Sequence, residues 1–182
     1  DFIEAGATVI TLNTYSTTPE RLEANDLSDK FSFFHKKAID LARAAIDQTQ
    51  KNVLIAGCLP PLVWSYRPDK APDYEKCVEL YLQIVREQEQ FVDLFICETM
   101  ASLKEAKAAV DAAKTSGKTV WCGLTLEDNE NCELRSGEKL LDSVRELQSF
   151  GQEEFLLNCS FPEAINSGIS TVSYTHLRAH ET

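Results

Sequence analysis

The sequence predicts an α/β fold, an incomplete (β/α)8 TIM barrel with about five parallel strands and intervening helices. Short apolar runs rich in β-branched residues alternate with longer amphipathic segments, which implies a parallel sheet with right-handed crossovers. The apolar runs are nearly continuous, as in strands that are buried on both faces. A doubly wound open sheet also fits this pattern. The absence of both a G-x-G-x-x-G segment after a strand and a P-loop favours the barrel.

The elements follow one another in a regular order. The chain opens on what resembles the last turn of a helix, with Gly6 just past its end, where positive φ is tolerated. A short helix is expected to begin at Pro19, because proline suits the first helical turn. Five strands are expected at residues 7–12, 53–57, 93–97, 119–124 and 154–158.

Four longer segments have the apolar periodicity of helices. Helix 102–115 is expected to open with a capping box of Ser102 and Glu105 and to close at Gly117, and helix 137–150 is expected to end at Gly151. The apolar faces of the other two helices are expected to be Phe33, Ala38, Leu41, Ala42, Ala45 and Ile46 in 29–49, and Val78, Tyr81, Leu82, Val85 and Phe91 in 73–91.

Size and composition limit the function. The 182 residues fall short of the roughly 250 of a complete barrel, so we expect about one strand to be missing in front and two behind. The net charge of -11 argues against nucleic-acid binding, which needs clustered Lys and Arg. The sequence contains no run of about 18 apolar residues that could span a membrane. The six cysteines include no C-x-x-C pair and indicate reduced thiols in a cytoplasmic protein.

Functional residues of both architectures gather at the carboxyl ends of the strands. There the sequence places Asn13 and Thr14, then Glu98 and Thr99, and finally Cys159. Each has a plainer explanation: the first pair could cap a turn, Glu98 could cap a helix or form an ion pair, and Cys159 could be a small buried hydrophobe. We expect Cys58, Cys97 and Cys122 to be core residues.

Taken together, these strand-end motifs resemble the homocysteine-binding barrel of the homocysteine S-methyltransferase family. The likeness runs over about residues 1–169 and rests on ordered segments. Asn158-Cys159-Ser160 with Pro162-Glu163 matches the family's N-C-S-x-P-E, and 93–99 matches its D-x-x-x-x-E-T. Residues 56–61 stand in the place of its G-S-x-G-P segment, and residues 2–7 and 13–15 also match.

The resemblance implies a chemistry. Family members bind zinc through the cysteine of the N-C motif and two adjacent cysteines of a later G-G-C-C motif, and the zinc binds the homocysteine sulfur as a thiolate. That thiolate takes a methyl group from an onium or folate donor, which yields methionine. By this resemblance Cys159 is a zinc ligand and Glu98 receives the homocysteine ammonium, where a carboxylate makes a charge-assisted hydrogen bond. Asn13, Thr14 and Thr99 would line the substrate pocket.

The sequence also departs from the family. Its opening D-G-G segment and its G-G-C-C motif are absent. Residues 170–182 are expected to be a tail outside the family domain. Within it, 172–182 matches nothing in the family and looks like a translated cloning scar or sequencing adapter. A genuine short tail is the alternative. The parent protein is therefore expected to be a methyltransferase, and this chain alone is expected to be an inactive fragment. An unrelated TIM-barrel enzyme remains a further reading. The sequence identifies neither the methyl donor nor the oligomeric state.

Overall fold

The computed structural model describes residues 2–179, and its centre is a sheet of five parallel strands in the order β1-β2-β3-β4-β5. The strands are β1 (Val9–Thr11), β2 (Leu54–Leu59), β3 (Leu94–Met100), β4 (Thr119–Leu124) and β5 (Glu154–Leu157). Each strand therefore pairs with the one before it in the chain, and the order never reverses. A doubly wound sheet reverses its strand order, so this arrangement confirms the partial barrel.

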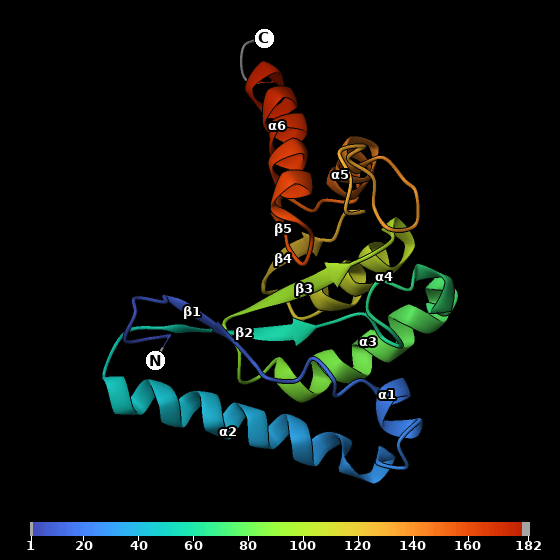
Figure 1. Ribbon diagram of the computed structural model, residues 1–182. Coiled ribbons are helices and arrows are strands. Elements are labelled where there is room, and N and C mark those ends of the chain that lie inside the picture. The colour runs from blue at the N-terminus through green and yellow to red at the C-terminus, as the bar shows by residue number, and fades with distance from the viewer. Residues whose placement is uncertain (1, 180–182) are drawn as a thin grey trace.

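The helices between and after the strands form an arc outside the sheet (Figure 1). They are α1 (Pro19–Glu23), α2 (Phe31–Thr49), α3 (Tyr74–Gln88), α4 (Leu103–Lys114), α5 (Leu140–Ser149) and α6 (Pro162–Ala179), with 3-10 turns η1 (Ser28–Lys30) and η2 (Pro68–Lys70). Helix α3 packs against α4 and β2, and α4 covers β3 and β4. Within the range that the structure describes, no helix is both long and apolar enough to cross a membrane.

Strand β3 is longer than the sequence predicts and is irregular at its end. Cys97 pairs with Cys122 and Met100 pairs with Leu124, so two residues of β3 oppose one residue of β4 between these pairs. The sequence analysis expects Glu98 and Thr99 to follow the strand. In the structure they lie inside a β-bulge of the strand itself. A bulge bends the strand and redirects side chains, and such bulges are common beside functional sites.

The inward face of α2 differs from the predicted one. His35, Ala38 and Ile39 are buried, whereas Phe33 and Leu41 are each 59% exposed. The prediction is thus wrong at Phe33 and Leu41 and missed the buried His35, whereas Ala38 is buried and Ala42, Ala45 and Ile46 are half-buried as expected for an inward face. In α3, Tyr81 and Val85 of the predicted apolar face are buried, as expected.

The capping box at the start of α4 is only half formed. The Ser102 hydroxyl accepts the Glu105 N–H at 3.2 Å, as predicted. The Glu105 carboxylate does not reach back to Ser102: it accepts the Leu62 N–H at 2.9 Å and the Tyr81 hydroxyl at 3.2 Å. Burial raises the pKa of Glu105. This carboxylate therefore ties α3 and α4 to the segment that follows β2.

Two glycines end helical turns as the sequence predicts. Gly151 has a φ of 80° after α5, its N–H bonds to Gln148 O, and the next N–H, of Gln152, bonds to Leu147 O. This paired pattern is the Schellman motif, which needs a residue in the left-handed region. Gly6, with a φ of 107°, ends the first turn of the chain with the same two hydrogen bonds, to Ile3 O and Phe2 O.

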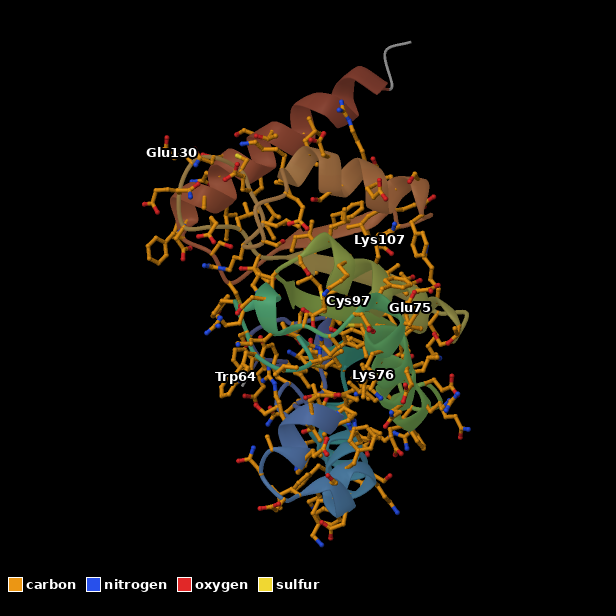
Figure 2. The ribbon with its side chains drawn as sticks, turned by 90° about the vertical axis from the view of Figure 1, so that its right-hand side faces the viewer. Trp64, Glu75, Lys76, Cys97, Lys107 and Glu130 are labelled. Carbon is orange, nitrogen blue, oxygen red and sulfur yellow. The ribbon has the colours of Figure 1, made fainter. Side chains whose placement is uncertain are left out.

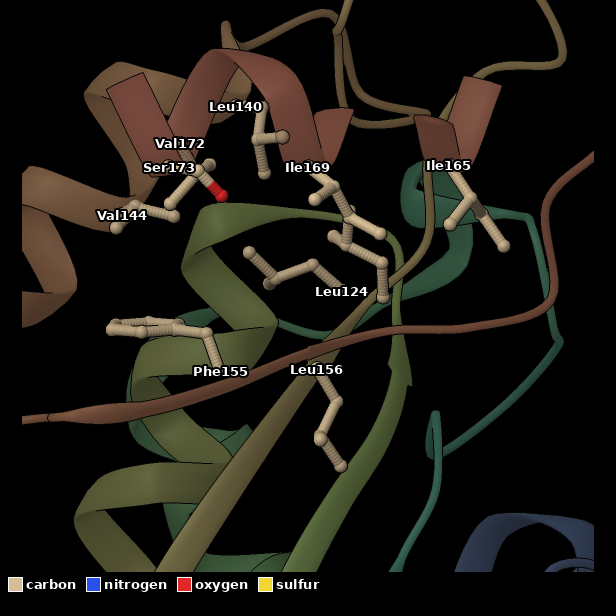
Figure 3. A pocket seen from close by; sticks show the side chains of 10 residues that line it. Leu124, Leu140, Val144, Phe155, Leu156, Ile165, Ile169, Val172 and Ser173 are labelled. Carbon is tan, nitrogen blue, oxygen red and sulfur yellow. The ribbon is translucent and has the colours of Figure 1, made fainter. Parts of the chain in front are cut away.

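An apolar hollow of about 330 Å³ lies between β5, α5 and α6 (Figure 3). Leu124, Leu156 and Ile169 line it together with Val172, which also packs against the core. Helix α6 thus continues past residue 169, where the sequence analysis places the start of the tail. The domain boundary there stays a prediction, and residues 180–182 lie outside the described residues.

Candidate active site at the ends of the strands

The structure brings two of the sequence motifs together. Thr99, at the end of β3, is fully buried, and its hydroxyl lies 3.5 Å from the sulfur of Cys159, which follows β5 and is exposed. Both residues have left-handed backbones, with φ of 61° for Thr99 and 54° for Cys159. A β-branched residue is rare in this region, and holding it there costs about 1–3 kcal/mol. Neighbouring groups must therefore hold Thr99 in place.

Asn158 is the group that holds Thr99. Its Oδ1 accepts the Thr99 N–H at 3.2 Å, and its Nδ2 donates to the Thr99 hydroxyl at 3.0 Å and lies 3.5 Å from the Cys159 sulfur. The amide therefore reaches from β5 to β3 across the end of β4. Gly123 of β4 leaves room for this bridge, because a Cβ there would lie 3.3 Å from Asn158 Oδ1 and 3.2 Å from Cys97 O.

The loop between β4 and α5 fixes the backbone around Cys159. Arg135 donates to Cys159 O at 3.3 Å, to the Thr125 hydroxyl at 3.2 Å and to Asp128 at 3.0 Å. Asp128 in turn accepts the Phe161 N–H at 2.9 Å, and this bond is the first cause of its lowered pKa, followed by the bond to Arg135. Asp128 and Arg135 thus fix the turn on both sides of Ser160, because Arg135 bonds to Cys159 O and Asp128 bonds to the Phe161 N–H.

Tyr66 reaches the Cys159 sulfur from the loop after β2. Its ring lies under the Arg135 guanidinium, 4.5 Å from the ring centroid to Cζ. Burial raises the pKa of Tyr66, and so does the hydrogen bond that its hydroxyl shares with the Cys159 thiol. Three groups that can donate therefore reach the Cys159 sulfur, from Thr99, Asn158 and Tyr66.

Glu98 is half-buried in the β3 bulge, and its Oε1 accepts a hydrogen bond from the Cys58 thiol at 3.0 Å. Cys58 is 1% exposed, so the prediction of a core cysteine is confirmed. Cys97 and Cys122 are equally buried, as predicted, and Figure 2 shows Cys97 deep within the molecule while Trp64 projects at its surface. The sequence analysis did not predict that Cys58 contacts Glu98.

The two residues after β1 lie in different surroundings. Thr14 is buried, and its hydroxyl accepts from Gln88 Nε2 at 3.3 Å. Asn13 is exposed. Their expected contact with substrate stays a prediction. Of the predicted residues, the structure joins Thr99 directly to Cys159, and it links Thr14 to Glu98 through Cys58, which hydrogen-bonds with both.

A sequence model of the family described as Homocysteine S-methyltransferase matches residues 1–181. The chain belongs to this family. The match includes most of the segment after residue 169 that the sequence analysis sets apart. A search of curated protein sequences finds no match.

Solved structures with the same fold include three forms of the homocysteine methyltransferase MmuM from Escherichia coli. The metallated form is 22% identical in sequence and superposes with a TM-score of 0.81; the match covers 94% of this chain and 64% of that one. The oxidized form is equally similar, with 63% of its chain covered, and the apo form has a TM-score of 0.65 at 20% identity. The chain thus spans less than two thirds of the length of these structural relatives.

The described residues do not form a complete metal site. Within residues 2–179, no three His, Cys, Asp or Glu side chains form a group that could hold a metal ion. Zinc takes three or four protein ligands, so the described residues do not make such a site by themselves. Cys159, exposed and surrounded by donors, is suited to be one ligand of it.

Sequence reasoning missed three residues of this region: Tyr66, Arg135 and Gln88. Tyr66 and Arg135 stand in long loops without a recognisable motif, and Gln88 is a single polar residue at the end of a helix. A left-handed tyrosine is not visible in a sequence, and an arginine in a loop usually points to solvent. The only available signal for Gln88 was its place on the apolar face of α3.

Proposed function

We propose that the protein is a zinc-dependent homocysteine S-methyltransferase that moves a methyl group from an onium or folate donor to homocysteine and so makes methionine. The observation that carries the proposal is the junction of Thr99, Asn158 and Cys159, in a chain of this family. This junction places the motif that contains Glu98 beside a cysteine whose sulfur is surrounded by hydrogen-bond donors.

Each predicted residue has a distinct task in this proposal. Glu98 receives the ammonium group of homocysteine in a charge-assisted hydrogen bond, because its carboxylate is half-buried and already fixed on one side by Cys58. Thr99 and Thr14 form the buried wall of the pocket, and Asn13 forms its exposed rim. Homocysteine and the methyl donor are thus the small-molecule partners that we propose.

Cys159 is the proposed zinc ligand that this chain supplies. A bound zinc ion would hold a thiol as thiolate near neutral pH, well below the ordinary thiol pKa of about 8.5. The tasks of the protein residues follow from their contacts: Arg135 fixes the backbone of Cys159, and Asn158 and Tyr66 contact its sulfur. The remaining zinc ligands must come from outside the described residues, because these contain no group of three candidate ligands.

For the same reason we propose that the 182-residue chain, taken alone, binds zinc weakly and does not methylate homocysteine. A single thiolate cannot compete with buffer and water for a metal that takes three or four ligands. Turnover by the purified chain would contradict this part of the proposal.

The test compares variants of the full gene product. Zinc content is measured by atomic absorption, and methylation of L-homocysteine is measured with betaine, S-methylmethionine and a methylfolate as donors. We expect Cys159→Ala to lose both zinc and activity, whereas Cys132→Ala, a change at the other cysteine that is not fully buried, keeps both. If Cys159→Ala retains full zinc and full activity, the role given to Cys159 is wrong.

A further inference from the structure

A buried glutamine joins four parts of the fold behind the candidate site. Gln88, at the end of α3, is 0% exposed. Its Oε1 accepts the Cys58 N–H at 2.9 Å, and its Nε2 lies 3.1 Å from His35 Nδ1 and 3.3 Å from the Thr14 hydroxyl. His35 Nε2 lies 3.1 Å from Thr17 O. The amide thus links α2, α3, the turn after β1 and the end of β2.

This network fixes the backbone of Cys58 with little freedom. Gly57 precedes it, and a Cβ at Gly57 would lie only 2.7 Å from Gln88 Oε1 and 2.5 Å from the Phe95 ring. The amide therefore sits directly against the main chain of β2. With its N–H held by Gln88 and its side chain 1% exposed, Cys58 keeps its thiol in the interior, where the thiol hydrogen-bonds with Thr14 and donates its own proton in one direction.

That direction leads to Glu98. The Cys58 sulfur donates to Glu98 Oε1 at 3.0 Å, a short separation for a thiol donor. Burial raises the pKa of the Cys58 thiol well above its usual range, and the Glu98 charge raises it further, so the thiol keeps its proton. A thiol that stays protonated is a permanent donor to the carboxylate.

We infer that Cys58 is a positioning residue: it holds the Glu98 carboxylate in the orientation that receives the ammonium group of an amino-acid substrate, and Gln88 holds Cys58 in turn. The inference deepens the proposed function, on which its substrate rests. Cys58 does not touch the substrate in this scheme. It fixes one carboxylate oxygen and leaves the other free for the ligand.

The other buried strand cysteines provide matched controls. Cys122 is 0% exposed in β4 and Cys97 is 0% exposed in β3, where the two residues pair across the sheet. Replacing Cys122 by alanine removes the same thiol volume from the same sheet without touching Glu98. A loss caused merely by a smaller core side chain would appear in Cys122→Ala as well.

The first experiment records the infrared S–H stretching band of the 182-residue chain. The contribution of Cys58 is isolated by subtracting the spectrum of Cys58→Ala. We expect a band at lower frequency than that of an unbonded thiol, and Glu98→Ala should move it to higher frequency. Cys122→Ala should leave the Cys58 band in place. A Cys58 band that does not move in folded Glu98→Ala, checked by circular dichroism, overturns the inference without reference to any substrate.

The second experiment measures binding of reduced L-homocysteine to the full gene product by calorimetry. Cys58→Ala should weaken binding on the order of tenfold, as for loss of a hydrogen bond to a charged group, while Cys58→Ser keeps a donor and should restore most of the affinity. Equal affinity in Cys58→Ala and in the unmodified gene product overturns the inference. If no variant binds homocysteine but the infrared band responds to Glu98→Ala, the proposed function fails and the Cys58–Glu98 pairing stands.

Discussion

The bridge from Asn158 to Thr99 depends on the absence of a side chain at Gly123, so Gly123→Ala should weaken the fold at this point. The added Cβ would lie 3.2 Å from Cys97 O and 3.3 Å from Asn158 Oδ1, closer than ordinary van der Waals contact. Cys97 O belongs to the β3 backbone and cannot retreat without straining the sheet, so the amide of Asn158 must move.

The structure sets the size of this effect. Crowding one methyl group into a packed site costs about 1–3 kcal/mol, and an unpaired Thr99 N–H costs about the same. Alanine also stiffens the unfolded chain, which returns about 0.4–1 kcal/mol. We therefore expect the free energy of unfolding, measured by urea denaturation, to fall by about 3 kcal/mol, with faster hydrogen exchange at the Thr99 amide.

A double-mutant cycle with Asn158→Ala tests the cause. If Gly123→Ala acts by displacing Asn158, then removing the amide first makes the added methyl less harmful, and the two losses should fall short of additivity by about 1 kcal/mol. Gly123 also faces Cys97 O, so part of the cost should persist in the double variant. Losses that add within about 0.5 kcal/mol would refute the reasoning.

Three further predictions concern buried or paired charges. Burial raises the pKa of Glu105, so the folded state loses stability as the pH rises from 4.5 through the raised pKa. Glu105→Gln keeps an acceptor for the Leu62 N–H, and its free energy of unfolding in urea should depend less on pH over that range. Burial lowers the pKa of His35, and a proton on Nδ1 would face the Gln88 amide, so stability should fall as the pH drops below 6.5; a His35→Asn variant should lack this slope. Arg135→Met should destabilise the chain by about 1–3 kcal/mol, and Lys139→Met, whose exposed pair should matter little, is its control in the same urea titration.

The strands and most helices could be predicted from the sequence because their signals are local. Residues 119–124 were predicted as a strand and form β4 with the same ends, since a continuous apolar run bounded by glycine and polar residues leaves little choice. The strand order was not local information. It followed only once the structure showed each strand beside its predecessor, which decided between the barrel and the doubly wound sheet.

The candidate site was predicted in part, and the reason for the rest is distance along the chain. The motifs place Glu98, Thr99 and Cys159 at strand ends, where parallel strands bring such residues to one edge. The groups that fix them come from 30 to 60 positions away, as with Gln88 and Cys58 or Asn158 and Thr99. A polar residue at the end of a helix has no sequence pattern that reveals such a partner.

The segment that follows β2 has a consequence for motion. Tyr81 donates to Pro60 O at 3.0 Å, Arg21 to Pro61 O at 2.9 Å and the Thr18 hydroxyl to Leu62 O at 2.6 Å, while Glu105 accepts the N–H of Leu62. Four side chains thus clamp three consecutive residues. The chain beyond them, from 63 to 66, is half-buried or exposed and carries Tyr66, whose hydroxyl shares a hydrogen bond with the Cys159 thiol. The clamp therefore separates residues 63–66 from the end of β2, so a displacement of Tyr66 need not disturb the sheet.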